Sequence, residues 1–416
     1  MRGWTLLASI GVLAALTGTV AAQRKPAPKP KPAAAKPAAQ VVTPPKARYA
    51  MDVGTASGLA GIMGGGKPSM GDMMRMASGG GNSESHTLHL RLGSVLAPTG
   101  GGPKADHYFL PPANMGPSVP LVTPVIQPSG TPETPQQFER PRGRLILFWG
   151  CGAHAPANQP VIIDFANLAA GQVPPDLFTS RVSFDRGPSV NNSRTYGEWP
   201  NARSGRMPQA GTLLGQHRIA GNYAPEIGFS LQQDYMPGIQ LRTTMPADGT
   251  VALNWSPVNA ATGYYAWLIG ANGAGRKGRN DTGDIVWWSS SSSRDFGGAL
   301  WDWISPGVVA GLVRDGTVMA PTTTNCVIPA EVRKATGEGM FGNLIAYGPE
   351  ENFVYPPRPE KGPWNQEWTA RVRFRSMTSF LPGMEMDGER SSNSRRDPPK
   401  KRCKPSLLGA VTGLGC

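Results

Sequence analysis

The 416-residue sequence predicts an all-β protein of two β-sandwich domains with a long disordered N-terminal tail and a short C-terminal one. Short apolar runs recur along the middle of the chain, separated by Gly, Pro and Asn, which is typical of all-β domains rather than of alternating strands and helices. Within residues 250–255, Val251, Leu253 and Trp255 stand at every second position, so a strand places them on one face. The two ends are instead rich in Lys, Arg and Pro.

A second strand is expected just after this one. Pro257 and a Thr-Gly pair break the run, and residues 264–269 then carry apolar groups on both faces, as in a strand at the middle of a sheet. Over residues 247–270, a strand ending in Trp-Ser-Pro, a short link and Gly-Tyr-Tyr resembles the second and third strands of a fibronectin type III domain. The resemblance implies that Trp255 and Tyr264 are core residues, and it implies no activity, because such sandwiches host many unrelated functions.

The N-terminus has the three parts of a secretory signal peptide. Arg2 is followed by a mostly apolar run at residues 6–16 and by small residues up to Ala22. We therefore expect residues 1–22 to direct export. The apolar run is too short to span a bilayer, and no later segment offers ~20 consecutive apolar residues, so we expect no transmembrane segment in the mature chain.

Residues 23–82 are expected to form a disordered linker. Residues 24–48 are rich in Lys, Pro and Ala, and regularly spaced prolines favour extended polyproline II, which makes a semi-rigid spacer. This composition resembles the Lys-Pro spacers of periplasmic TonB-type proteins. Residues 57–81 are rich in Gly and Met and indicate a flexible linker. Copper handling is an alternative, because thioethers are soft ligands for Cu(I). The methionines concerned are Met63, Met70, Met73, Met74 and Met76.

Two terminal segments account for the whole net charge of +13. Residues 24–48 carry +7 and residues 390–404 carry +6, so the body between them is close to neutral. A nucleic-acid-binding domain needs its basic residues on the folded surface, so nucleic acid is an unlikely partner. The tails suit a salt-sensitive attraction to an anionic envelope component, such as a cell-wall polymer or a lipid headgroup. Alternatively, they only keep the protein in solution.

The first β-rich domain is expected over residues 83–236. Its strand-like runs are residues 86–92, 144–149, 161–165, 216–220 and 227–231. Prolines spread over residues 111–141 exclude a helix or a central strand there and predict a long irregular loop. His86 and His89 fall on opposite faces of their strand, so we expect no metal site from them.

The second, fibronectin III-like sandwich is expected over residues 237–383, followed by a basic C-terminal tail at residues 384–416. Its strand-like runs are residues 251–255, 264–269, 284–288, 299–303, 343–347 and 368–374, and short helices are expected at 308–313 and 330–334. In the last run apolar residues alternate with Arg371 and Arg373. This pattern predicts a strand at the edge of a sandwich, with one buried and one solvated face.

The chain has four cysteines, an even number that predicts disulfides in an exported protein. They are Cys151, Cys326, Cys403 and Cys416. The sequence leaves three pairings open, one of which joins Cys403 to Cys416 in a small basic loop and Cys151 to Cys326 across the two domains. A catalytic thiol at Cys151 beside His154 is a weaker alternative, because no third orienting group is evident and oxidation would consume the thiol.

Six of the eleven tryptophans lie between Trp255 and Trp303. In the strand at 264–269 one face carries Tyr264 and the other carries Tyr265 and Trp267. Packing in a core or between domains is the simplest explanation. The alternative is an aromatic surface that binds a glycan or a protein. Its candidate binding residues are Tyr265, Trp267, Trp287 and Trp288.

No motif indicates a cofactor or a metal. Residues 273–278 spell GxGxxG, but a strand rather than a helix is expected after them, which excludes a dinucleotide site. Residues 61–67 resemble a phosphate-binding loop, but Pro68 replaces the required Ser or Thr. The cysteines and histidines lack zinc spacing, and the five histidines lack the context of a catalytic triad.

We therefore expect an exported binding or structural protein of the cell envelope, periplasmic or secreted and non-enzymatic. Its basic tails would hold it to an anionic envelope component, with a protein partner as the other choice. The overall make-up resembles secreted alphaproteobacterial proteins of unknown function. The alternative is a glycan-binding protein or a hydrolase acting on an envelope polysaccharide, which a cleft with two close carboxylates would favour. Candidates for that pair are Asp164, Asp185, Asp284 and Asp302.

Overall fold

The computed structural model describes residues 40–63, 84–109, 113–125, 143–169, 179–185, 187–201, 204, 207–208, 211–272, 283–337 and 339–383. The described residues from 41 onward belong to one compact unit. The expected signal peptide, most of the Lys-Pro spacer, the C-terminal tail with Cys403 and Cys416, and four of the five linker methionines lie outside the described residues.

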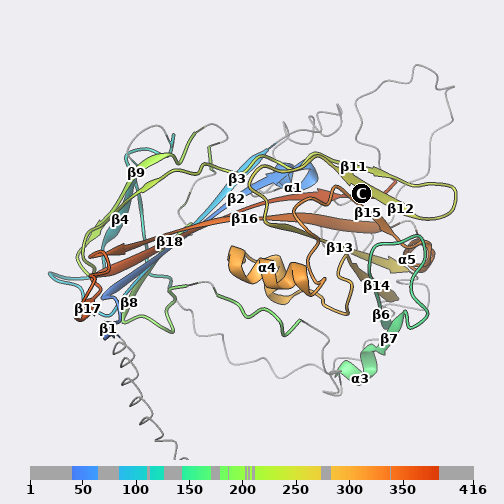
Figure 1. Ribbon diagram of the computed structural model, residues 1–416, viewed down its shortest axis with the longest axis horizontal. Helices are drawn as coiled ribbons and strands as arrows, with labels where there is room; N and C mark the ends of the chain where they lie inside the picture. The colour runs from blue at the N-terminus through green and yellow to red at the C-terminus, as the bar shows by residue number, and fades with distance from the viewer. Residues whose placement is uncertain are drawn as a thin grey trace, which may run out of the picture. The chain divides into compact units, whose positions relative to one another are not determined.

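A nine-stranded mixed sheet forms the centre of the fold (Figure 1). Its strands, in spatial order, are β7 (Val161–Asp164), β6 (Arg144–Trp149), β14 (Asp284–Ser289), β13 (Gly263–Asn272), β16 (Met340–Tyr355), β18 (Trp368–Phe380), β2 (Ala47–Ser57), β3 (Ser85–Ser94) and β8 (Thr195–Trp199). Neighbouring strands are antiparallel except for the parallel pairs β6–β14 and β18–β2.

Three smaller sheets complete the described strands. The four-stranded sheet has the order β10 (Ile227–Leu231), β9 (Gly215–Gly221), β4 (Ala105–Phe109) and β5 (Ser118–Pro120). The three-stranded sheet has the order β11 (Leu241–Thr244), β12 (Val251–Trp255) and β15 (Asn325–Ile328). Strands β1 (Val42–Thr43) and β17 (Trp364–Asn365) form a short parallel pair.

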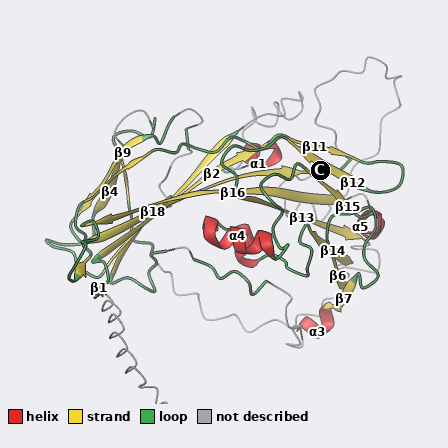
Figure 2. Ribbon diagram, in the orientation of Figure 1, coloured by secondary structure: helices red, strands yellow, loops and turns green. Residues whose placement is uncertain are grey.

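The described helices are few and short (Figure 2). They are α1 (Gly58–Met63), α3 (Phe165–Ala169), the 3-10 helix η1 (Gly298–Trp301), α4 (Pro306–Arg314) and α5 (Ala330–Thr336). The helices expected at 308–313 and 330–334 are confirmed by α4 and α5, whereas most of the run 299–303, expected as a strand, is η1. Helix α4 begins with a proline, which suits a first helical turn, and it buries Val309 and Leu312 against the nine-stranded sheet.

The four-stranded and three-stranded sheets pack on the same face of the nine-stranded sheet, at opposite ends of its long strands (Figure 1). One continuous hydrophobic core therefore joins Phe229 of β10, Val372 of β18 and Leu253 of β12, all of them buried. Burial of each such side chain stabilises the fold by about 1.5–3 kcal/mol. Strands β16 and β18 reach both ends, with a bulge in their pairing between Tyr347 and Glu350.

The all-β class is confirmed, but the two expected domains are not separate. Strand β6, from the first expected domain, pairs with β14 of the second, and β2 pairs with β18. The expected boundary at residues 236/237 falls in a connection in which Met236 and Ile239 are buried. The carbonyls of Met236 and Ile239 there accept hydrogen bonds from Thr55 at 2.6 Å and Ser57 at 2.9 Å, both on β2. Two sandwiches thus share one long sheet.

Strand β2 lies inside the range 23–82 that was expected to be a disordered linker. All of its residues except Arg48 are buried, because β18 and β3 flank it and both of its faces are covered. Helix α1 follows directly. The linker expectation was therefore wrong for residues 42–63. Composition hid this strand, because it lies between a Lys-Pro segment and a Gly-Met segment and itself contains Asp52, Gly54 and Thr55.

Strand β18 was expected at the edge of a sandwich with a solvated face, and this expectation was wrong. It lies between β16 and β2. The side chain of Arg373, on the face expected to be solvated, is only 2% exposed. The alternation of arginine with apolar residues was recognised in the sequence, but the carboxylate that makes burial of an arginine possible lies on another strand.

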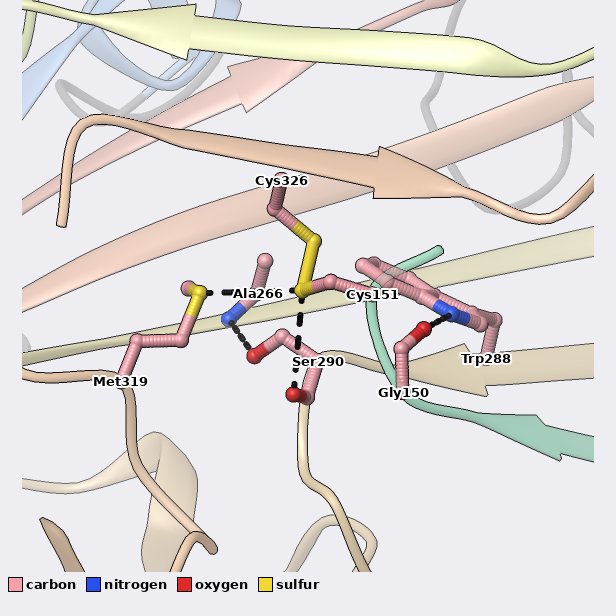
Figure 3. Close-up of a disulfide and its surroundings, with 7 residues drawn as sticks. All are labelled: Gly150, Cys151, Ala266, Trp288, Ser290, Met319 and Cys326. Carbon is pink, nitrogen blue, oxygen red and sulfur yellow. Dashed lines mark hydrogen bonds between the residues drawn. A yellow bond between two sulfur atoms is a disulfide. The ribbon is translucent and has the colours of Figure 1, made fainter. Parts of the chain in front are cut away.

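The disulfide between Cys151 and Cys326 is present, and the two residues are 175 positions apart in the sequence (Figure 3). It links the end of β6, in the nine-stranded sheet, to β15 in the three-stranded sheet. The Cys151 sulfur also lies 3.9 Å from the Met319 sulfur and 3.9 Å from the Ser290 carbonyl oxygen (Figure 3). A disulfide sulfur has no proton to donate, so these are contacts rather than hydrogen bonds.

Within the described part of the chain, no helix has both the length and the apolar character that crossing a membrane requires.

Candidate ligand groove on the charged face

The face of β2, β3 and β18 that points away from the core is lined with charge, and we call it the charged face. Strand pairing brings its members side by side: Arg373 is opposite Asp52, and Asp52 is opposite His89. The charged face consists of Arg48, Asp52, His89, Arg91, Arg371, Arg373 and Arg375.

Asp52 is the carboxylate at the centre of this face, and its side chain is only 2% exposed. Its oxygens accept hydrogen bonds from Arg373 Nε at 2.8 Å and Arg373 Nη2 at 3.1 Å, and Arg91 binds one of the same oxygens. A buried charge needs such pairing, because desolvation of an unpaired ion costs several kcal/mol.

Trp303 covers this ion cluster. Its indole Nε1 donates to the Val53 carbonyl at 2.7 Å, and its own carbonyl accepts from Arg373 Nη1 at 2.7 Å. The Arg375 guanidinium lies 3.6 Å from the centroid of a Trp303 ring, a cation–π contact. Burial lowers the pKa of Arg375 to about 10, although Asp302 and Asp52 oppose this effect. The segment after β14 therefore closes the middle of the charged face to solvent.

Next to this covered part the charged face has a half-open groove of about 400 Å³. It lies where β2, β18 and the far end of β16 meet Trp364 of β17 and a loop before β8 that includes Asp185, Gly187 and Pro188. Its polar lining is Arg48, Asp185, Asn352, Gln366, Thr369 and Arg371, and the indole of Trp364 also lines it. This combination of a concave surface, one aromatic wall and a few polar groups is typical of ligand sites.

An ion pair fixes one side of the groove. Arg371 Nη2 donates to Asp185 Oδ1 at 3.1 Å and to the Asp185 carbonyl at 3.2 Å, while Nη1 binds the other carboxylate oxygen. The hydrogen bond from Arg371 holds the pKa of Asp185 below its usual range. Gly187 lets this loop lie close to the sheet: its φ is +74°, and an added Cβ would lie 3.0 Å from the Cβ of Ala50.

Several polar groups in the groove are not committed to protein partners. Among the described residues, Arg48 donates only from Nη2, to the carbonyl and side-chain oxygens of Asn192 at 2.9 and 3.0 Å. The Asn352 amide nitrogen donates to Glu350 at 2.6 Å, and its side-chain carbonyl oxygen has no hydrogen-bond partner among the described residues. The side chains of Gln366 and Thr369 have no hydrogen-bond partner among the described residues. The groove thus offers amide, hydroxyl and guanidinium groups to a ligand.

The four aromatic candidates from the sequence do not form one surface. Tyr265 and Trp288 are fully buried, and they belong to cores on opposite faces of the nine-stranded sheet. Tyr265 donates to the Asp295 carbonyl at 3.2 Å, and Trp288 donates to the Gly150 carbonyl at 2.9 Å. Trp287 is also buried, and Trp267 is partly exposed.

Trp301, an aromatic residue outside that set, is exposed at the surface beside two of the four candidates. It is 37% exposed, and its ring centroid lies 4.9 Å from that of Trp267 and 5.6 Å from that of Trp287. Its position in η1 rather than in a strand explains why the strand pattern of the sequence did not single it out.

The four candidate carboxylates do not gather at one place, although Asp164 and Asp284 are both neighbours of Arg144. Asp185 lines the groove, bound to Arg371. Asp284 receives a hydrogen bond from Arg144 at 3.0 Å, and Asp164 lies opposite Arg144 in the strand register. Asp302 follows η1 and accepts from the Trp303 amide at 2.9 Å. The groove is lined by Asp185 alone among the four.

The groove could not be recognised as a site from the sequence. Its residues come from β2, the loop before β8, β16, β17 and its flanking residue Gln366, and β18, and pairing between strands that are far apart in the chain brings them together. The arginines at alternate positions of β18 were visible as a pattern, but the pattern did not show which of them lies beside an opening.

Comparisons with protein families, with curated proteins and with solved structures found no match for this chain. The resemblances to fibronectin type III domains and to secreted alphaproteobacterial proteins therefore stay predictions. Trp255 and Tyr264 are core residues, as the first of these implied: they are buried, on β12 and β13 in facing sheets, with ring centroids 5.4 Å apart.

Proposed function

We propose that the protein is an exported, non-enzymatic binding protein of the cell envelope that holds a segment of an envelope polysaccharide in the groove. In this proposal the basic tails add a salt-sensitive, non-specific attraction to anionic envelope components, and the groove supplies the specific contacts. The end of the fold that carries the fibronectin III-like strand pair at residues 247–270 serves as scaffold.

The observation that carries the proposal is the uncommitted polar lining beside an indole. Sugar hydroxyls both donate and accept hydrogen bonds, and Gln366, Thr369 and Asn352 offer complementary groups that the other described residues leave available. The apolar face of a sugar ring can lie against Trp364. A half-open groove suits a segment of a chain, whose two ends must continue beyond the site.

Two further observations support an envelope location and a binding role. Disulfides persist in oxidising compartments, and Cys151 is joined to Cys326. A glycosidase needs a general acid with a raised pKa, whereas Arg371 lowers the pKa of the one aspartate that lines the groove. Binding is therefore favoured over hydrolysis at this site.

The test measures binding of the mature chain, residues 23–416, to purified envelope polysaccharide by calorimetry at high salt, which suppresses the attraction of the tails. We expect Trp364→Ala and Gln366→Ala each to weaken binding about tenfold or more, which corresponds to ~1.4 kcal/mol. Trp301→Ala is the matched control, because it removes a partly exposed indole outside the groove.

The outcome that would overturn the proposal is binding that survives both groove substitutions. A loss caused only by Trp301→Ala would move the site to the aromatic surface around Trp267. Because Trp364 donates to the Pro356 carbonyl at 2.9 Å, its replacement affects local structure as well, and Gln366→Ala serves as the variant with no such contact. Circular dichroism of each variant verifies the fold.

A further inference from the structure

We propose that the groove selects an acidic saccharide, one whose sugar units carry a carboxylate or a phosphate, and that Arg48 binds this oxyanion. The inference rests on the proposed function and adds the chemical class of the ligand. It comes from the one guanidinium of the charged face that has neither an acidic partner nor an aromatic cover within the part of the chain that the structure describes.

The other arginines of the charged face each have an acidic or an aromatic partner. Arg371 is paired with Asp185, and Arg91 and Arg373 share Asp52. Arg375 lies against the Trp303 ring, and Asp302 and Asp52 attract its charge. Each of these cations therefore already has its partner within the fold.

Arg48 differs from all of them. Its only hydrogen bonds run from Nη2 to the two oxygens of Asn192, a neutral residue, and among the described residues it forms no ion pair. The Asn192 contacts hold the guanidinium in place but do not neutralise it. Its Nε and Nη1 hydrogens remain available in a partly buried position at the groove.

The rest of the lining adds no free negative charge to repel an anion. Asp185 is held by Arg371, and Lys46 pairs with the nearby Glu367 at 2.7 Å. The charges of the groove lining therefore sum to +1, and its sugar-binding groups are neutral. Hydrogen bonds from guanidinium to carboxylate or phosphate are charge-assisted and about twice as strong as neutral ones.

The experiment measures binding of the mature chain to three polymers by calorimetry at physiological salt. They are polygalacturonate, its methyl ester, in which the same sugar backbone has lost its charge, and poly(glycerol phosphate), which carries phosphate without that backbone. We expect polygalacturonate to bind at least tenfold more tightly than its methyl ester. If poly(glycerol phosphate) binds more tightly than polygalacturonate, the oxyanion that Arg48 binds is a phosphate.

Arg48→Gln tests the assigned residue and should remove most of the preference for the charged polymer. The matched control is Arg218→Gln, which removes one cation from an exposed pair with Glu226, so that the two variants have the same net charge. We expect Arg218→Gln to keep the preference. An equal loss in both variants would assign the effect to net charge and overturn the inference.

The inference and the proposed function fail in distinguishable ways. If the acid and the methyl ester bind equally and Gln366→Ala weakens both, the groove binds saccharide without selecting charge, so the inference fails alone. If Gln366→Ala and Arg48→Gln both leave polymer binding unchanged, the groove is not the site and both proposals fail.

Discussion

At the scale of single residues, a chain of buried hydrogen bonds links the nine-stranded sheet to the four-stranded sheet. The Tyr49 hydroxyl oxygen lies 2.5 Å from His107 Nδ1, and His107 Nε2 lies 2.8 Å from His217 Nδ1. His217 Nε2 in turn lies 2.6 Å from the Leu213 carbonyl oxygen. A carbonyl only accepts, so His217 Nε2 donates to it. With both histidines neutral, His107 then donates to His217, and Tyr49 donates to His107.

This chain predicts that the protein is less stable in mild acid. Burial lowers the pKa of both His107 and His217 in the folded state, and it also lowers the pKa of His86 and His89. The unfolded chain therefore binds more protons below pH ~6.5, the ordinary histidine value. Stability contributed by the neutral histidines is present above that pH and is lost as the pH falls toward the depressed folded values.

Urea unfolding at pH 7.5 and pH 5.0 measures this effect, and we expect a lower free energy of unfolding at pH 5.0. His107→Ala should destabilise the protein by about 2–4 kcal/mol at pH 7.5, because it leaves Tyr49 and His217 without their partner. It should also make the stability less dependent on pH. An unchanged pH dependence in this variant would show that the chain does not contribute to it.

At the scale of strands, the sequence was informative where one face is apolar. The runs at 144–149, 227–231, 251–255 and 343–347 all lie within strands. The sequence pattern did not predict β2 and β4, whose buried positions include Asp52 and His107. Such polar residues can be buried because Arg373 and His217 pair with them. These partners lie on strands far along the chain, so the local sequence pattern does not reveal them. The groove was hidden for the same reason, since non-local pairing decides which uncommitted side chains meet.

The disulfide is the covalent counterpart of this non-local pairing. Cys151 and Cys326 close a loop of 175 positions, and cross-links over long loops remove much entropy from the unfolded chain. We expect the double variant Cys151→Ser, Cys326→Ala to lose about 2–4 kcal/mol of stability in urea unfolding. A reductant should lower the stability of the unaltered protein to a similar value and leave the double variant unchanged. Further loss in the reduced variant would assign part of the effect to Cys403 and Cys416.

At the scale of the whole molecule, the shared sheet replaces the two separate domains that the spacing of strands predicted. Strands β16 and β18 cross from one sandwich to the other, and a single hydrophobic core follows them. In this arrangement neither sandwich keeps its sheet intact without the other. The ion cluster of Asp52 and the groove both lie along these shared strands, so the candidate site depends on the complete sheet.

This architecture predicts that the two sandwiches unfold together. Phe229 is buried in the four-stranded end, where it stacks on Phe353 at 4.8 Å, and we expect Phe229→Ala to cost about 3–5 kcal/mol. If unfolding is cooperative, amide hydrogen exchange in β12 and β15, at the other end, should become faster by a similar free energy. Independent domains would instead confine the faster exchange to β4, β9 and β10, and urea unfolding would show two transitions. Faster exchange in β12 and β15 of the Phe229→Ala variant would show that the long strands β16 and β18 couple the two ends.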